Sequence, residues 1–167
     1  MRIVLKGVLL LSCLLFVNCF GFNSRTDDFS TPIRNYKPII MNRTAFENSI
    51  ETLPVQAVQK SGKIYIFDQF MFVNDVNLGF HVYDYSNPTS PIAIKFLKIP
   101  GATDLAIRNS KLYINQAVDL VTMYFDSQAL TFSVLYRNKD VFPQKNSPDG
   151  FQSYVEPNDI IINWIPN

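Results

Sequence analysis

The chain has 167 residues and is nearly neutral, with 15 basic against 14 acidic side chains and one histidine. Hydrophobic residues make up 47% of it and aromatic residues 14%, which excludes an intrinsically disordered protein. The formal charge of +1 predicts no strong field for an anionic polymer, so we expect no nucleic-acid partner. The length is enough for one globular domain.

The N-terminus has the pattern of an export signal. Two basic residues precede the apolar run Gly7 to Val17, which is too short to span a bilayer but typical of a secretory signal. Cys19 follows in a sequence that resembles the lipobox of bacterial lipoproteins, and Cys13 is the alternative. We expect residues 1–18 to be removed and Cys19 to be acylated, so that acyl chains hold the protein to a membrane. A signal that is discarded without acylation is the competing interpretation.

The segment after the signal predicts a linker and then a short helix. We assign residues 19–42 to a flexible tether, because two prolines and a set of polar residues interrupt any regular pattern there: Asn23, Ser24, Arg25, Asp27, Asp28 and Ser30. Thr44 and Glu47 have the spacing of a capping box. This spacing predicts a helix from Arg43 to Glu51, within the segment 43–53.

From residue 62 onward the sequence repeats itself. Ile64 aligns with Leu105, 41 residues later, and Phe80 aligns with Leu120, 40 residues later. Each copy has four short apolar segments separated by turn residues, which predicts four antiparallel strands. A period of about 40 residues is typical of one β-propeller blade. The alternative is a meander of short strands that is periodic by chance.

One turn of the first copy carries a family resemblance. The run from Gly79 to Pro91 resembles the LVIVD-type repeat of bacterial surface β-propellers, in which a strand ending in Asp leads into a Ser-Asn/Asp-Pro-x-x-Pro turn. The resemblance covers about 54–141 and implies two blades. The second copy departs from it, with Tyr124 in place of the Asp and Asp126 beginning its turn. We expect structural turn roles for Asp84, Ser86, Asn87, Pro88 and Pro91.

The predicted fold class is all-β, with about two four-stranded antiparallel propeller-type blades that form an incomplete β-propeller. A short N-terminal helix precedes the blades at 54–141, and a loop and a C-terminal strand follow at 142–167. Two blades cannot close a ring, so at least one apolar sheet face should remain uncovered. A truncated propeller, a ring closed by oligomerisation and a face covered by the tail are three explanations.

Residue types that carry catalysis are scarce in the repeats. His81 lies in the middle of a predicted strand, with no second histidine or cysteine to complete a zinc or Cys-His site. Asp75, Asp104 and Asp119 flank strands but lack the spacing of a calcium loop. We therefore expect no catalytic residue, no cofactor and no metal.

Export, repeats and missing catalytic chemistry favour a non-enzymatic lipoprotein of the cell envelope. We expect it to be anchored by its lipid, at the outer membrane, and to present a β-propeller-like module to a protein or glycan partner. Self-association through open blade edges is a further expectation. One alternative is an enzyme or metal-binding subunit whose site needs further blades, and another is a truncated fragment without function.

Overall fold

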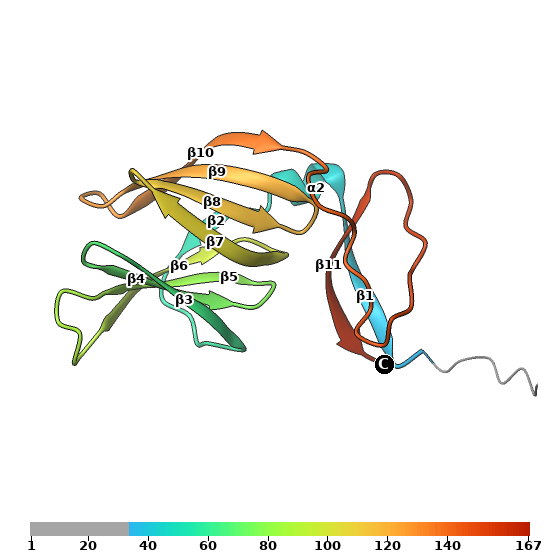
Figure 1. Cartoon of the computed structure of the whole chain (residues 1–167), viewed down its shortest axis with the longest axis horizontal. Helices are drawn as coiled ribbons and strands as arrows, with labels where there is room; N and C mark the ends of the chain where they lie inside the picture. Colours follow the sequence, from blue (N-terminus) through green and yellow to red (C-terminus); the bar gives the residue numbers. More distant parts are fainter. Residues whose placement is uncertain (1–33) are drawn as a thin grey trace, which may run out of the picture. The chain divides into compact units, whose positions relative to one another are not determined.

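The computed structural model describes residues 34–167, which form a β-rich unit (Figure 1). Its elements are β1 (Tyr36–Asn42), α2 (Arg43–Glu47), β2 (Glu51–Leu53), β3 (Ser61–Phe67), β4 (Phe70–Asp75), β5 (Gly79–Asp84), β6 (Ile92–Lys98), β7 (Ala102–Arg108), β8 (Lys111–Gln116), β9 (Asp119–Asp126), β10 (Thr131–Asn138) and β11 (Asp159–Pro166). All strand pairs in this part of the chain are antiparallel. The prediction of an all-β chain built from antiparallel strands is confirmed.

The two copies of the sequence repeat form two separate sheets. The first sheet has the strand order β2-β6-β5-β4-β3, and the second sheet has the order β10-β9-β8-β7. Within each sheet the four strands of one copy follow one another as a meander. The short strand β2 adds a fifth strand beside β6 in the first sheet, and β10 of the second sheet has no such neighbour.

The main hydrophobic core lies between these two sheets. Alternation along the strands turns Phe70 and Phe72 of the first sheet toward Phe125 of the second. The ring centroids of Phe70 and Phe125 are 5.0 Å apart and those of Phe72 and Phe125 are 5.5 Å apart, both edge to face. Aromatic pairs in this geometry stabilise a fold beyond the area that they bury. Each sheet therefore uses one face to cover the other.

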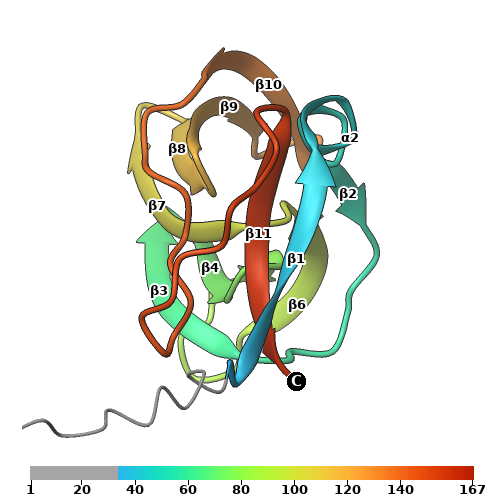
Figure 2. The same ribbon diagram turned by 90° about the vertical axis from the view of Figure 1, so that its right-hand side faces the viewer.

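Strands β1 and β11 pair into a two-stranded ribbon at one end of both sheets (Figure 2). A second, smaller core joins this ribbon and α2 to the second sheet, through Phe46, Val118 and Ile160. The ribbon thus packs on the ends of strands and not on the outer sheet faces. The predicted C-terminal strand is present as β11.

Two predictions for the segment before the repeats are wrong. Residues 36–42 form strand β1 and not a tether, because β11 at the far end of the sequence supplies a partner that local sequence does not reveal. The helix ends at Glu47, since the amide and the hydroxyl of Ser49 both bond to the Phe46 carbonyl. Residues 51–53 are extended as β2.

The start of α2 also differs from the predicted capping box. The N-cap residue is Asn42, whose side-chain oxygen accepts a hydrogen bond of 2.8 Å from the Ala45 amide. Thr44 therefore lies inside the helix. The predicted signal peptide 1–18, with Cys13, and the acylation site Cys19 lie outside the described residues.

Candidate functional site

The turn between β5 and β6 contains the five residues for which we expect a structural role. The carboxylate of Asp84 accepts a bond of 2.9 Å from the Ser86 amide. Bonding by the Ser86 side chain and by this amide lowers the pKa of Asp84. Asn87 accepts bonds from the amide and the hydroxyl of Thr89, at 3.2 and 2.8 Å. Pro88 lies at the corner, where its fixed φ suits a turn. Pro91 directly precedes the first residue of β6.

The equivalent turn of the second sheet is built from different residues. Strand β9 continues two residues past Tyr124, the position that aligns with Asp84, and ends at Asp126. The Asp126 carboxylate then accepts bonds from the amides of Gln128 and Ala129, at 2.9 and 3.0 Å. The aspartate of this turn therefore lies two residues after the position that aligns with Asp84.

His81 is part of a buried hydrogen-bonded pair on the outer face of the first sheet. Its Nε2 lies 3.0 Å from Oδ2 of Asp75, and both side chains are almost fully buried. Asp75 also accepts bonds from the amides of Gln59 and Lys60, in the segment that leads from β2 to β3. Burial would raise the pKa of Asp75, but these bonds outweigh it and hold the pKa below its usual range. The pair therefore fixes this crossing segment to the sheet.

Asp119 is the centre of a second buried cluster, at the start of β9. Both of its carboxylate oxygens lie 2.8 Å from the Arg43 guanidinium of α2, and Arg137 of β10 donates at 3.0 Å. Burial would raise the pKa of Asp119, but the two arginines and the Asp140 amide keep it low. Both guanidinium groups also lie over the Phe46 ring. This cluster joins the helix to the second sheet.

Asp104, the third of the acidic residues that we expect to flank strands, lies inside β7. The Tyr65 hydroxyl donates to it at 2.5 Å and the Lys63 ammonium at 2.7 Å, so these contacts join β3 to β7. Burial and the bond to Asp104 raise the pKa of Tyr65 to about 12. The structure therefore keeps Asp75, Asp104 and Asp119 in three separate clusters. In the part of the chain that it describes, no group of three or more His, Cys, Asp or Glu side chains could hold a metal ion.

A cleft of about 630 Å³ lies between the sheet ends, the ribbon and the loop that begins at Phe142. Lys60, Lys145, Phe142 and Trp164 line it, and no acidic residue of the described chain does so. Its amide and hydroxyl groups come from Asn77, Thr103, Asn115, Gln144, Asn146 and Asn163. The side-chain oxygen of Asn115 is buried and has no partner in the described chain.

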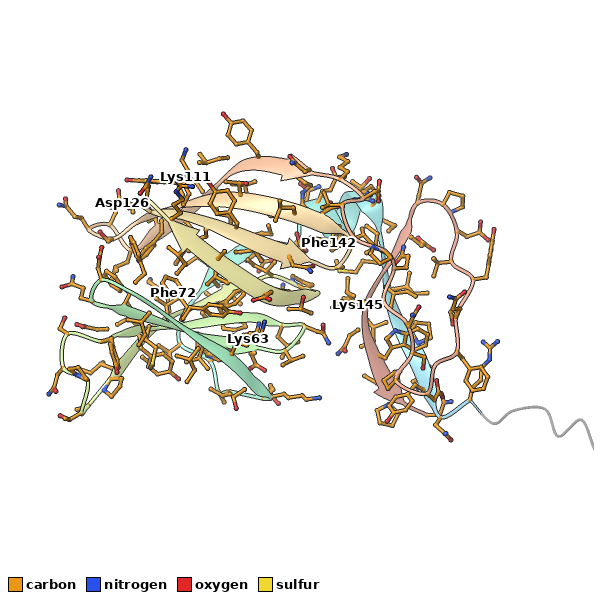
Figure 3. The ribbon with its side chains drawn as sticks, viewed as in Figure 1. Lys63, Phe72, Lys111, Asp126, Phe142 and Lys145 are labelled. Carbon is orange, nitrogen blue, oxygen red and sulfur yellow. The ribbon has the colours of Figure 1, made fainter. Side chains whose placement is uncertain are left out.

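Lys145 holds the wall of this cleft together. Its ammonium donates to the side chain of Asn77, to the Gly101 carbonyl at 2.9 Å and to the Ile162 carbonyl at 3.3 Å. No carboxylate of residues 34–167 pairs with it, and burial lowers its pKa to about 8. Figure 3 shows Lys145 between the sheets and the ribbon, at the opposite end of the sheets from Lys111.

The outer faces of the two sheets are partly apolar and open. On the first sheet Ile64 and Ile66 are 60% and 59% exposed. On the second sheet Tyr124 and Tyr136 are 43% and 69% exposed. The uncovered apolar face that the repeat predicts is therefore present on each sheet. The two outer faces and the Lys145 cleft are therefore candidate contact surfaces for a partner.

Sequence reasoning missed Lys145 and both arginines of the Asp119 cluster. No local motif marks them, since Arg43 and Asp119 are 76 residues apart and Lys145 and Asn77 are 68 apart. The one signal for Lys145 was its place in a loop rich in turn residues before β11.

Comparison with family models, with curated proteins and with solved structures finds no match to this chain. No helix within residues 34–167 is long and apolar enough to cross a membrane.

Proposed function

We propose that this chain is a non-enzymatic, lipid-anchored protein of the cell envelope, at the outer membrane, whose two sheets are propeller-type blades. Support for the blades comes from the 40-residue period and the face-to-face packing of the two meanders. The likeness to the LVIVD-type repeat adds to this, through the turn from Asp84 to Pro91. Support for the anchor comes from the apolar leader and Cys19.

The Lys145 cleft is the binding site of this module, and its ligand is an acidic glycan. The observation that carries this proposal is the set of side chains that line the cleft, rich in amides and without an acid. Amide groups offer a donor and an acceptor together, which suits sugar hydroxyl groups. The side chains of Asn77, Gln144 and Asn163 are bonded within the protein, so Asn115 and Asn146 supply the amides for the ligand. The rings of Phe142 and Trp164 suit the apolar faces of sugars. Lys60 favours a carboxylate on the ligand, and Lys145, whose three donors are used in the cleft wall, adds its positive charge nearby.

The enzyme and metal-subunit alternatives have no observation in their favour here. The acids of the three clusters are each held by arginine, lysine, histidine or backbone donors from the same unit. Those groups stabilise contacts between elements, and none of them lines the cleft around Lys145.

Calorimetric titration of the purified full chain tests the glycan proposal. We expect a uronic-acid oligosaccharide to bind at least about tenfold more tightly than a neutral oligosaccharide of equal length. Lys60→Gln should weaken only the acidic ligand, because it removes a cation that lines the cleft. Lys111→Gln removes the same charge at the opposite end of β8 and is the matched control. Equal binding of both sugars, or an equal effect of both variants, would contradict the proposal.

Intact mass spectrometry of the chain purified from membranes tests the anchor. We expect an acyl adduct on a chain that starts at Cys19, present in Cys13→Ala and lost in Cys19→Ala. The opposite pattern would assign the anchor to Cys13. An unmodified chain in the wild type would reject the lipoprotein proposal.

A further inference from the structure

The sequence repeat relates the open face of each sheet to the buried face of the other. Ile64 and Ile66 on the outer face of the first sheet align with Leu105 and Ile107 on the buried face of the second. On the same side of the first sheet, the partly exposed Met71 and the buried Val73 align with Leu112 and Ile114 of that buried face. The outer face of the first sheet therefore repeats the surface with which the second sheet binds the first.

The reverse relation holds for the other open face. Tyr113 and Thr122 on the outer face of the second sheet align with Phe72 and Val82, which are buried against the second sheet. Leu120 aligns with the buried Phe80. Each outer face thus resembles the buried face of the other sheet. The two outer faces should therefore fit each other as the two buried faces do in the core between the sheets.

We infer that a second copy of this chain docks head to tail, with its second sheet on the outer face of the first sheet of its neighbour. The contact on the first sheet, which we call the isoleucine face, is formed by Ile64, Ile66 and Met71. The contact on the second sheet, the tyrosine face, is formed by Tyr113, Tyr124 and Tyr136. This inference rests on the blade interpretation given above, but on neither the lipid anchor nor the glycan.

The position of the other elements leaves both faces accessible. The segment from β2 to β3 is tied to Asp75 and so covers the end of the first sheet that holds Asp75 and His81. Ile64 and Ile66 remain mostly exposed beyond it. The ribbon of β1 and β11 lies at the ends of the sheets (Figure 2). A contact between two different faces repeats from copy to copy and closes a ring when the rotation allows.

The size of the assembly follows from the blade count. Closed propellers contain about four to eight blades, so two blades per chain correspond to about two to four copies. The tyrosine face is more polar than its buried counterpart, because Lys111 replaces Phe70 and Thr122 replaces Val82. We therefore expect association that depends on concentration, and not a permanent complex.

Sedimentation equilibrium of the full chain in mild detergent tests this arrangement with one variant for each face. Ile64→Lys/Ile66→Lys places two ammonium groups on the isoleucine face, and Tyr124→Lys/Tyr136→Lys does the same on the tyrosine face. Since all four side chains are largely exposed, both variants should fold, which far-UV circular dichroism checks. Tyr154→Lys, at an exposed loop residue, is the control.

We expect each face variant alone to associate at least about a hundredfold more weakly than the wild type, because charged groups would have to be buried unpaired. A mixture of the two variants should recover a dimer of one copy of each, since each keeps the face that the other lacks. The control should behave as the wild type.

Three results would overturn the inference. The first is a wild-type chain that is monomeric at all concentrations, and the second is a mixture that does not recover the dimer. The third is association that persists in both variants, which would point to the free edge of β10 instead. Because neither variant changes Cys19 or the Lys145 cleft, each of these results leaves the proposed anchor and glycan site standing.

Discussion

The first and second sheets have the same chain path but different chemistry at equivalent positions. Gly79 begins β5, and the residue that aligns with it at the start of β9 is Asp119, which is fully buried against two arginines. The Asp75–His81 pair joins β4 to β5 in the first sheet. The aligned residues in β8 and β9 of the second sheet are Gln116 and Val121. The repeat therefore determines the order of the strands and the face on which each sheet packs. The polar residues that attach each sheet to its neighbouring segments differ between the two copies.

The largest expected effects come from the position that Gly79 and Asp119 share. Gly79 has φ +147°, and an added Cβ would lie 2.0 Å from the Leu97 carbonyl oxygen, so Gly79→Ala should prevent the native pairing of β5 with β6. Asp119→Ala should cost about 3–5 kcal/mol, because it leaves two guanidinium groups without their buried partner. Urea denaturation measures both. Asp140→Asn keeps a residue suited to the positive φ of this position, removes only the charge of an exposed partner of Arg43 and should cost less than about 1 kcal/mol.

The same carboxylate gives the second sheet a pH dependence. The pKa of Asp119 is lower in the folded chain than its unfolded value of about 4, so its contribution is present above that value. It is lost as the pH falls through the folded pKa. Wild type should therefore lose more stability than Asp119→Ala between about pH 4 and the acid limit. If the free energy of unfolding falls equally with pH in the two proteins, this assignment is wrong.

Lys145 bonds the β4–β5 turn of the first sheet to the ribbon, and it should give the next largest effect. Its folded pKa is about 8, against 10.5 in the unfolded chain, so the unfolded state binds more protons between these values. Stability should rise by about 2–3 kcal/mol from pH 8 to pH 10. Lys145→Met should abolish the rise. Tyr65 has a folded pKa of about 12, so its ionisation changes the stability only above about pH 10, the pKa of an unperturbed tyrosine. A rise that persists in Lys145→Met would contradict the account.

The buried pair of the first sheet can be converted to the residues of the second. His81→Val leaves Asp75 with its backbone donors only and should cost about 1–3 kcal/mol. Asp75→Gln with His81→Val recreates the combination found at Gln116 and Val121. A double-mutant cycle in urea should give a coupling of about 1 kcal/mol or more between the two sites. Additive effects would mean that the two side chains act independently.

The two β-turns should show the smallest effects. Asp84→Ala and Asp126→Ala each remove a side-chain acceptor of backbone amides in an exposed turn. We expect faster hydrogen exchange at the amides of Ser86 and Gln128, respectively, with little change in the thermal midpoint. Exchange at the turn of the other sheet is the internal control. Equal acceleration in both turns would indicate a global effect instead.

The sequence predicts the repeated part of the fold well, because its information there is local. Alternating apolar residues and turn residues recur about 40 positions apart, and β3 to β10 fall within that pattern. The ends of the unit could not be predicted in this way. Strand β1 exists because β11 pairs with it, and the C-terminus of α2 is set by side-chain bonds of Ser49 to the preceding turn.

The candidate surfaces depend even more on distant contacts. The cleft combines Lys60, Asn115 and Lys145 from three separate segments, and no spacing in the sequence brings them together. The sequence predicts that open faces exist, because two blades leave faces uncovered. Their complementarity emerges only when the alignment of the repeats is read together with the core between the sheets.

Native mass spectrometry of the full chain extracted from membranes tests both the lipid anchor and the association through the two outer faces. We expect complexes of two to four copies, in which every copy starts at Cys19 and carries an acyl adduct. Unmodified monomers at all protein concentrations would contradict both the anchored module and the complementary faces.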